Sequence, residues 1–181
     1  MRKLLIAIVA IFAIGSFSAS AQKIGHIDYM KVVDSLDTYK KAMAKQKEVE
    51  ATATESATYL EKLIREKYAY YQANEKTMPS IEKTIKMDEL NGLQQRLQEV
   101  EQVYLDQMEI INTRYMVPIQ DWLKQAVANV GKVRGMDYVM YYQEEGGTFW
   151  VNPGKGVDLT NDVIAEMRRL ELANPVITPG E

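Results

Sequence analysis

Residues 81–117 read IEKTIKMDELNGLQQRLQEVEQVYLDQMEIINTRYMV, and this stretch decides the fold. It contains no proline, and its large apolar residues recur three and four positions apart, with one slip after Tyr104. They are Leu90, Leu93, Leu97, Val100 and Tyr104, then Met108, Ile111 and Tyr115. This spacing gathers the apolar side chains on one face of an α-helix. The stretch therefore predicts one long amphipathic helix.

A second and weaker stripe precedes it. Residues 29–76 contain neither proline nor glycine, and positions three and four apart give Leu36, Tyr39, Met43, Gln46, Glu50, Ala53, Ala57, Leu60, Ile64, Lys67 and Tyr71. Because three of these residues are polar and the middle ones are small, the stripe predicts a long helix with a loosely filled contact face.

Pro79 separates the two stretches. Proline lacks a backbone N–H and disfavours the helical conformation for the preceding residue, so the first helix should end near Met78, and Ser80 can cap the second. Two stripes joined by a short turn predict an antiparallel coiled-coil hairpin with its tip near residues 77–82. Each helix would reach roughly 50–60 Å at about 1.5 Å per residue.

Strands are predicted near both ends of this hairpin. Residues 23–28, KIGHID, form a short strand in which Asp28 can cap the following helix. Residues 138–142 and 148–151 are aromatic and β-branched runs on either side of the glycine-containing loop 143–147, a pattern typical of a β-hairpin.

Two shorter helices accompany these strands. Pro118 precedes an apolar-periodic run, so the helix is expected to kink or restart there and to close at Gly131 and Gly135. A final amphipathic helix is predicted from Asp158 onward, with Thr160 as its cap.

The predicted fold class is α+β and mostly α, with a long antiparallel coiled-coil helical hairpin inserted in a small β-containing body. The hairpin, residues 37–116, is the arm, and residues 22–36 and 117–172 form the body. Residues 173–181 contain two prolines and are expected to be a mobile tail.

The body is small enough to favour self-association. Three short strands leave two open edges and bury a small core, and such edges are often paired with other chains. We predict a homo-oligomer interface made of Ile24, Ile27, Val139, Tyr141, Phe149 and Val151. The same residues could instead fill the core of a monomer, and the pattern favours neither arrangement.

Residues 1–21 read as a cleavable signal peptide. They have a basic start, an apolar core at residues 4–14 and a small-x-small site at residues 19–21. An uncleaved membrane anchor is the alternative, but the apolar run is shorter than the roughly 20 residues that span a bilayer. We predict export to the periplasm and cleavage after Ala21.

Composition argues against an enzyme. Cysteine is absent, which excludes disulfides and thiolate chemistry, and His26, the only histidine, is expected to be an ordinary strand residue. Glu144 and Glu145 could be imagined as a glycosidase pair, but solvated loop carboxylates lack the apolar pocket that separates their pKa values. We predict no catalytic residue, no cofactor and no metal. The net charge is −3, or −5 once Arg2 and Lys3 are removed, so no nucleic-acid partner is expected.

The distal half of the predicted arm is rich in aromatic, Ile and Met side chains. They are Tyr59, Tyr68, Tyr70, Tyr71, Met78, Ile81, Ile85 and Met87. Two packed helices bury only a narrow face of each, so some of these side chains must face solvent. Tyr and Met make adaptable contacts, which favours a binding surface for unfolded chains. The alternative is that they lie on the contact face or at its margins.

Several short motifs also follow one another in a recognisable order. After the signal peptide come the strand 23–28, Leu36-x-x-Tyr39-Lys40-Lys41-Ala42, Pro118-Ile119, Gly135-Met136-Asp137-Tyr138-Val139 and Asp158-Leu159-Thr160. As a set they resemble the Skp/OmpH family of periplasmic chaperones. The resemblance implies a homotrimer with a strand-built trimerisation body and three arms around a cavity. It also implies an ATP-independent holdase, in which unfolded outer-membrane β-barrel proteins are held in the cavity and kept from aggregating.

The net acidic charge is a departure from the best-known family members, which are strongly basic. It argues against lipopolysaccharide or anionic-membrane contact. The alternative function is that of a non-enzymatic structural or adaptor protein of the envelope, which would use the arm as a spacer. An adaptor predicts one saturable partner, whereas a holdase predicts many unfolded clients.

Overall fold

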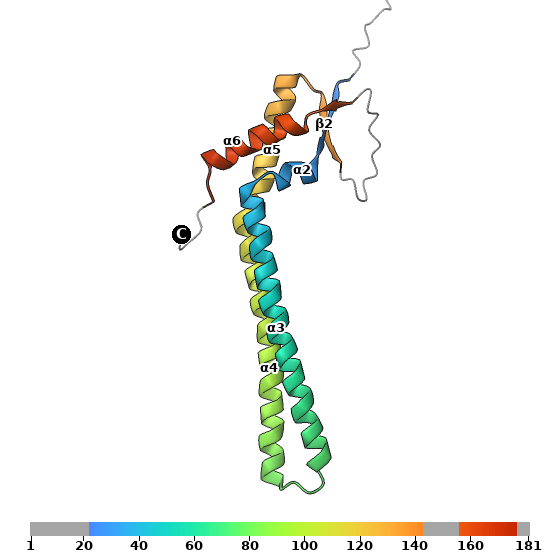
Figure 1. The fold of residues 1–181 in the computed structure, drawn as a ribbon, viewed down its shortest axis with the longest axis vertical. Coiled ribbons are helices and arrows are strands. Elements are labelled where there is room, and N and C mark those ends of the chain that lie inside the picture. Colours follow the sequence, from blue (N-terminus) through green and yellow to red (C-terminus); the bar gives the residue numbers. More distant parts are fainter. Residues whose placement is uncertain (1–21, 143–155, 177–181) are drawn as a thin grey trace, which may run out of the picture.

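The computed structural model describes residues 22–142 and 156–176. The elements in chain order are β1 (Ile24–Asp28), α2 (Tyr29–Asp34), α3 (Asp37–Asn74), α4 (Ser80–Ile111), the π-helical turn η1 (Asn112–Met116), α5 (Val117–Arg134), β2 (Tyr138–Tyr142), β3 (Val157–Asp158) and α6 (Thr160–Ala173). Figure 1 shows α3 and α4 projecting as one long hairpin from a small body built by the other elements. The predicted mostly helical α+β fold, with a helical hairpin inserted in a β-containing body, is confirmed.

The contact face of α4 is the one that the stripe predicts. Leu90, Leu93 and Ile111 are buried, and Tyr115 continues the face into η1. On α3 the predicted face is right from Ala53 onward but wrong nearer the body, where Met43 and Glu50 are exposed. There Ala42 and Val49 pack toward Ile111 and Tyr115 instead.

The register differs because residues 29–76 form two helices rather than one. α2 ends at Asp34, the Ser35 hydroxyl donates to the Val32 carbonyl at 2.6 Å, and Leu36 has an extended backbone with ψ 136°. This break directs the Leu36 side chain into the body core. It also rotates the start of α3, so that residues other than the predicted ones face α4. The predicted Asp28 cap is confirmed, since Asp28 Oδ1 accepts the Lys31 N–H at 3.1 Å.

The tip turns where Pro79 requires it, but Ser80 is not the cap. Pro79 has an extended ψ of 149° and already occupies the N-cap position of α4, and no side chain caps this end. Its carbonyl accepts the Lys83 N–H at 3.0 Å. Ser80 is therefore the first helical residue, and its predicted capping role is wrong.

The expected change of helix at Pro118 takes the form of a π-helical turn. The N–H of Val117 donates to the carbonyl of Asn112, five residues earlier, in place of the usual four. Because proline has no N–H, the ladder is already interrupted at position 118, which makes the wider turn less costly. Gly131 lies inside α5, and the helix closes only at Gly135, whose φ of 63° is in the left-handed region.

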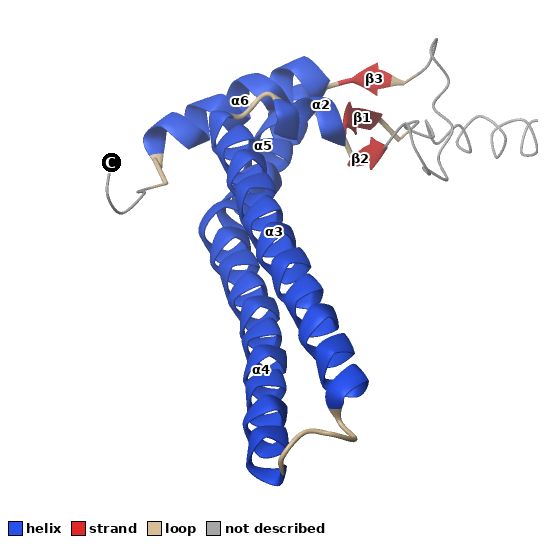
Figure 2. Ribbon diagram, turned by 60° about the horizontal axis from the view of Figure 1, so that its bottom comes forward, coloured by secondary structure: helices blue, strands red, loops and turns tan. Residues whose placement is uncertain are grey.

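The three strands form a parallel sheet in the order β2-β1-β3, visible at one end of the body in Figure 2. Ile24 lies opposite Tyr138, and Gly25 opposite Val157. The short strand β3 was not predicted. The predicted strand at 148–151 and its hairpin loop lie outside the described residues.

The start of α6 also corrects the sequence prediction. The helix begins at Thr160, two residues later than expected, and the Thr160 hydroxyl does not cap it. Instead, that hydroxyl accepts the N–H of Asp28 at 3.0 Å, and the Thr160 N–H donates to Asp158 Oδ1 at 2.8 Å. Thr160 thus joins α6 to the end of β1.

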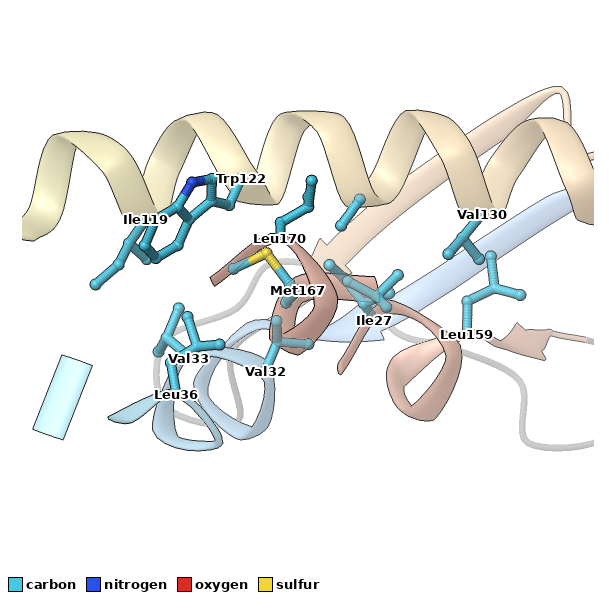
Figure 3. Packing of buried hydrophobic residues seen from close by; sticks show 12 residues of the cluster. Ile27, Val32, Val33, Leu36, Ile119, Trp122, Val130, Leu159, Met167 and Leu170 are labelled. Carbon is cyan, nitrogen blue, oxygen red and sulfur yellow. The ribbon is translucent and has the colours of Figure 1, made fainter. Parts of the chain in front are cut away.

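The body core lies between α2, α5, α6 and β1, and Figure 3 shows its side chains converging from these elements. Its buried residues are Ile27, Val32, Val33, Leu36, Ile119, Trp122, Ala126, Val130, Leu159, Val163, Met167 and Leu170. α6 packs across α5, as Figure 1 shows. Within residues 22–142 and 156–176, no helix combines the length and the apolar character that a bilayer crossing needs.

Candidate functional site

Most of the arm residues predicted to contact a partner lie at the surface. Exposed side chains are those of Tyr59, Tyr68, Tyr70, Ile81, Ile85 and Met87. Ile81 is 75% exposed and Tyr59 64%, so neither contributes much to the contact between α3 and α4. Tyr71 is half-buried, and Met78 is only 8% exposed at the tip, where it faces inward.

The arm also exposes apolar side chains that the sequence argument missed. They are Met43, Val103, Leu105 and Ile110, all in the half nearer the body. Val103 and Ile110 are seven residues apart and lie on the same side of α4. This seven-residue spacing could have been recognised in the sequence. One contact face cannot bury both the main stripe and a second row of apolar residues beside it, so the second row is expected to be exposed.

A groove opens along this same half of the arm, between α3 and α4. Its volume is about 810 Å³, and Val49, Leu60, Val100 and Ile111 form its apolar floor. It forms because α3 contributes small or polar residues here, among them Ala53 and Ser56, which do not fill the space between the helices. We call it the arm groove.

Three cations and two carboxylates lie around the arm groove. Lys45, Arg96 and Arg114 line it together with Glu48 and Glu99. Within residues 22–142 and 156–176, none of the three cations has a carboxylate within ion-pair distance. Elsewhere on the arm, Arg65 pairs with Glu61 at 3.6 Å and Lys62 with Glu66 at 3.9 Å. Lys47, Lys76 and Lys83 make no ion pair among the described residues.

Near the tip a charged pair joins the two helices. Lys67 on α3 binds Glu89 on α4, and Lys86 lies 3.6 Å from the same carboxylate. The hydrogen bond from Lys67 is the main reason that the pKa of Glu89 falls below its ordinary value. Lys86 Nζ also lies 5.8 Å from the ring centre of Tyr70, so this exposed ring borders a cation.

The residues predicted to form an oligomer interface divide into two groups. Ile24 and Tyr141 are exposed, and the Tyr141 ring contacts Tyr29 of the same chain, with the ring centres 5.7 Å apart and the planes tilted by 45°. Ile27 is 1% exposed inside the body core, and Val139 packs against that core. Phe149 and Val151 lie outside the described residues. Ile27 therefore belongs to the interior of one chain, which was the alternative considered for it.

The body carries ionised groups that hold its helices together. Hydrogen bonds from Arg169 and Asn129 lower the pKa of Glu166 to about 2, and this carboxylate links α6 to α5. Glu171 accepts the Thr38 N–H at 2.6 Å and so satisfies the first turn of α3. Glu166 thus joins two helices of the body, whereas Glu171 joins the body to the arm.

Metal-binding geometry is not found in the part of the chain that the structure describes. No group of three His, Cys, Asp or Glu side chains there is close enough to hold an ion. His26 lies in β1, opposite Met140 and Asp158, as a strand residue.

A two-helix arm on a small body with a parallel sheet is the architecture of a known family. The sequence profile described as outer membrane protein (OmpH-like) matches residues 23–167. The chain therefore belongs to the OmpH-like family, and the resemblance to Skp/OmpH proteins is confirmed.

A solved structure shares this fold. It is an OmpH-like protein from Caulobacter crescentus CB15, described as a proposed outer membrane chaperone. The identity is 15%, the match covers 91% of this chain and 92% of the other, and the TM-score is 0.57. No curated protein matches the chain.

Proposed function

We propose that this protein is an ATP-independent holdase chaperone of the periplasm, which binds unfolded outer-membrane β-barrel proteins and prevents their aggregation. The observation that carries the proposal is the apolar surface of the arm. Large apolar and aromatic side chains between Tyr59 and Ile110 are exposed to solvent on both arm helices. In a compact domain, side chains of this kind would be buried in the core. Soluble proteins rarely leave so much apolar surface open unless it binds something.

The chemistry of this surface suits partners without one fixed shape. Tyrosine and methionine side chains give amphipathic or deformable contacts, so many weak contacts can form along one arm and exchange. A client held in this way is released when it folds elsewhere, because mass action alone governs the exchange. Family membership and the fold shared with the Caulobacter protein support a chaperone role.

We further propose that the arms act in a homotrimer built through the body, with the clients between them. The exposed Ile24 and Tyr141 of the sheet support an interface between chains. The outer edge of β2 has no partner strand within the described residues, and open edges favour pairing with another chain. Sedimentation of the mature protein tests this, since a trimer and a monomer differ threefold in mass.

An aggregation assay tests the holdase. The purified mature protein, at a stoichiometric ratio and without nucleotide, is expected to keep a diluted, urea-unfolded barrel protein soluble. The triple variant Tyr70→Ser/Ile81→Ser/Ile85→Ser should lose at least half of this protection, since it removes three exposed apolar contacts.

The matched control removes exposed apolar side chains from the body instead. Val133 and Leu172 are 85% and 83% exposed, so Val133→Ser/Leu172→Ser should protect the client as well as the unmodified protein does. If the unmodified protein fails to prevent aggregation, the proposal is wrong. A single saturable partner in pull-downs, with no unfolded barrel proteins, would favour the adaptor function instead.

A further inference from the structure

The arm has two grooves at the same level, and they differ in charge. The arm groove is lined by Lys45, Arg96 and Arg114 against two carboxylates. On the opposite side of the hairpin, a groove of about 470 Å³ is bordered by Glu50, Glu61 and Glu101 and lined by no cation. The two grooves share Ala53, Val100 and Tyr104, so only a thin layer of side chains separates them.

The cations of the arm groove stand at its two ends. Arg96 lies on α4 toward the tip, whereas Arg114 lies in η1 at the base of the arm. Lys45 is also near the base, since Ala42 and Val49 on the same helix pack into the cluster around Ile111. Glu48 and Glu99 also line the groove, so its three cations and two carboxylates leave one net positive charge. Its middle combines apolar side chains with the polar Thr52, Ser56 and Gln107.

Its length sets the size of an occupant. The 18 residue steps from Arg96 to Arg114 make about 27 Å at 1.5 Å per helical residue. An extended chain rises about 3.3 Å per residue, so about eight residues fit along the groove. A transmembrane β-strand has about 9–11 residues, which is close to this length.

The three cations of the arm groove outnumber its two carboxylates and make no ion pair with them, which favours an acidic occupant. Among the described residues, Lys45, Arg96 and Arg114 make no ion pair, and Glu99 instead accepts a hydrogen bond from Gln95 at 3.0 Å. A cation beside an apolar floor gains most from a carboxylate that sits partly shielded from water. The overall net charge of −3 makes this site a local exception in an acidic protein.

We propose that the arm groove binds an extended segment of an unfolded chain, about eight residues long, with apolar or aromatic side chains in its middle and carboxylates near both ends. This inference rests on the proposed chaperone function and names the segment that a client presents. Apolar side chains enter the groove over Val49, Leu60 and Ile111. The flanking carboxylates pair with Arg96 at one end and with Lys45 and Arg114 at the other.

Direct peptide binding tests the charge preference. Two fluorescent nine-residue peptides share an apolar centre of alternating Val and Tyr, and one carries Asp near both ends where the other carries Lys. The mature protein should bind the Asp peptide at least tenfold tighter, with an advantage that shrinks as salt is raised. Equal affinities, a preference for the Lys peptide, or no binding of either peptide would overturn the inference.

Neighbouring substitutions test the location. Ser56 lines only the arm groove and Ala57 only the opposite one, so Ser56→Leu and Ala57→Leu add similar volume to different grooves of the hairpin. Ser56→Leu should lower the affinity for the Asp peptide at least fivefold, whereas Ala57→Leu should change this affinity less than twofold. Equal effects of the two variants would place the peptide elsewhere.

Charge reversal keeps the location testable if Ser56→Leu fails to fold. Arg96→Glu changes an exposed groove residue, and Lys47→Glu makes the same change at an exposed position outside both grooves. Only Arg96→Glu should reduce the preference for the Asp peptide.

The two proposals can fail separately. If the unmodified protein binds both peptides equally but still prevents barrel-protein aggregation, the groove inference is wrong and the chaperone function stands. If aggregation proceeds but the Asp peptide is still selected, the groove binds a different acidic partner and the holdase proposal falls.

Discussion

The body and the arm use apolar residues in opposite ways. In the body, Ile27, Val33 and Met167 come from three separate elements and are almost completely buried in one core. In the arm, two helices of 38 and 32 residues bury few large side chains against each other and leave many in water. The small body therefore contributes most of the buried core that stabilises the fold, whereas the long arm contributes the exposed apolar surface.

The largest expected effect comes from the body core. Trp122→Ala should lower the free energy of unfolding by about 3–5 kcal/mol, because the ring is buried between α5 and the helices that cover it. Ile81→Ala, on the arm, should change it by less than about 0.5 kcal/mol, since the side chain is 75% exposed. Urea unfolding at fixed protein concentration measures both. Similar losses from the two variants would contradict the division between body and arm.

A smaller effect is expected from the contact face of the arm. Leu93→Ala should cost about 2 kcal/mol, at the low end for a buried leucine, because a thin two-helix hairpin can partly close the space. Amide hydrogen exchange should then accelerate in α3 and α4 but not in α5. Faster exchange spreading through α5 would mean that arm and body unfold as one unit.

The cap of α2 gives a pH-dependent test of the body. Burial alone would raise the pKa of Asp28, but hydrogen bonds and charge from Lys31 outweigh it, so the pKa lies below its ordinary value of 3.8. A lowered folded-state pKa contributes stability above pH 4 that is lost as the pH falls through the folded value.

Asparagine keeps an oxygen that can cap the helix, so Asp28→Asn removes chiefly the charge. It should lower the free energy of unfolding by about 0.3–1 kcal/mol at pH 7 and lose its effect in strong acid. Asp121→Asn is the control, because this carboxylate is exposed and lies 3.7 Å from Lys124. The measurement is urea unfolding of both variants between pH 7 and pH 2. A loss of the same size at every pH would rule out the charged cap.

The smallest effect is expected where the two regions meet. The Tyr115 hydroxyl is buried at the base of the arm and has no hydrogen-bond partner among the described residues. Tyr115→Phe should thus leave the thermal midpoint unchanged or raise it slightly, because an unpaired buried hydroxyl carries a desolvation cost. A fall of several degrees would reveal a partner for this hydroxyl.

Periodicity predicted those elements whose geometry is decided locally. The stripe from Leu90 to Tyr115 and the turn at Pro79 depend on helical spacing and on the missing N–H of proline, so the sequence alone suffices. Leu36 was misplaced because the body core, built from residues distant in sequence, draws its side chain out of the helix. Thr160 was misassigned for the same reason, since its hydroxyl bonds to the backbone N–H of Asp28, 132 residues away.

The candidate site was predictable in kind but less so in position. An excess of apolar residues over what one contact face can bury indicated an exposed surface, and Tyr59 and Ile81 lie on it. The arm groove was not foreseen, because it depends on how small residues such as Ala53 and Ser56 meet the opposite helix. Met78 was included among the candidate contact residues, but it is buried at the tip. Its burial depends on how the tip folds back, which helical periodicity does not predict.

Hydrogen exchange of the mature protein, with and without an unfolded barrel protein, tests the central claim most directly. The arm is expected to exchange faster than α5 and α6 when free, since its helices have fewer buried contacts. With the client bound, protection should increase in α3 and α4 and stay unchanged in the body. Protection confined to the body, or an arm as slow to exchange as the body when free, would contradict an open arm that captures unfolded chains.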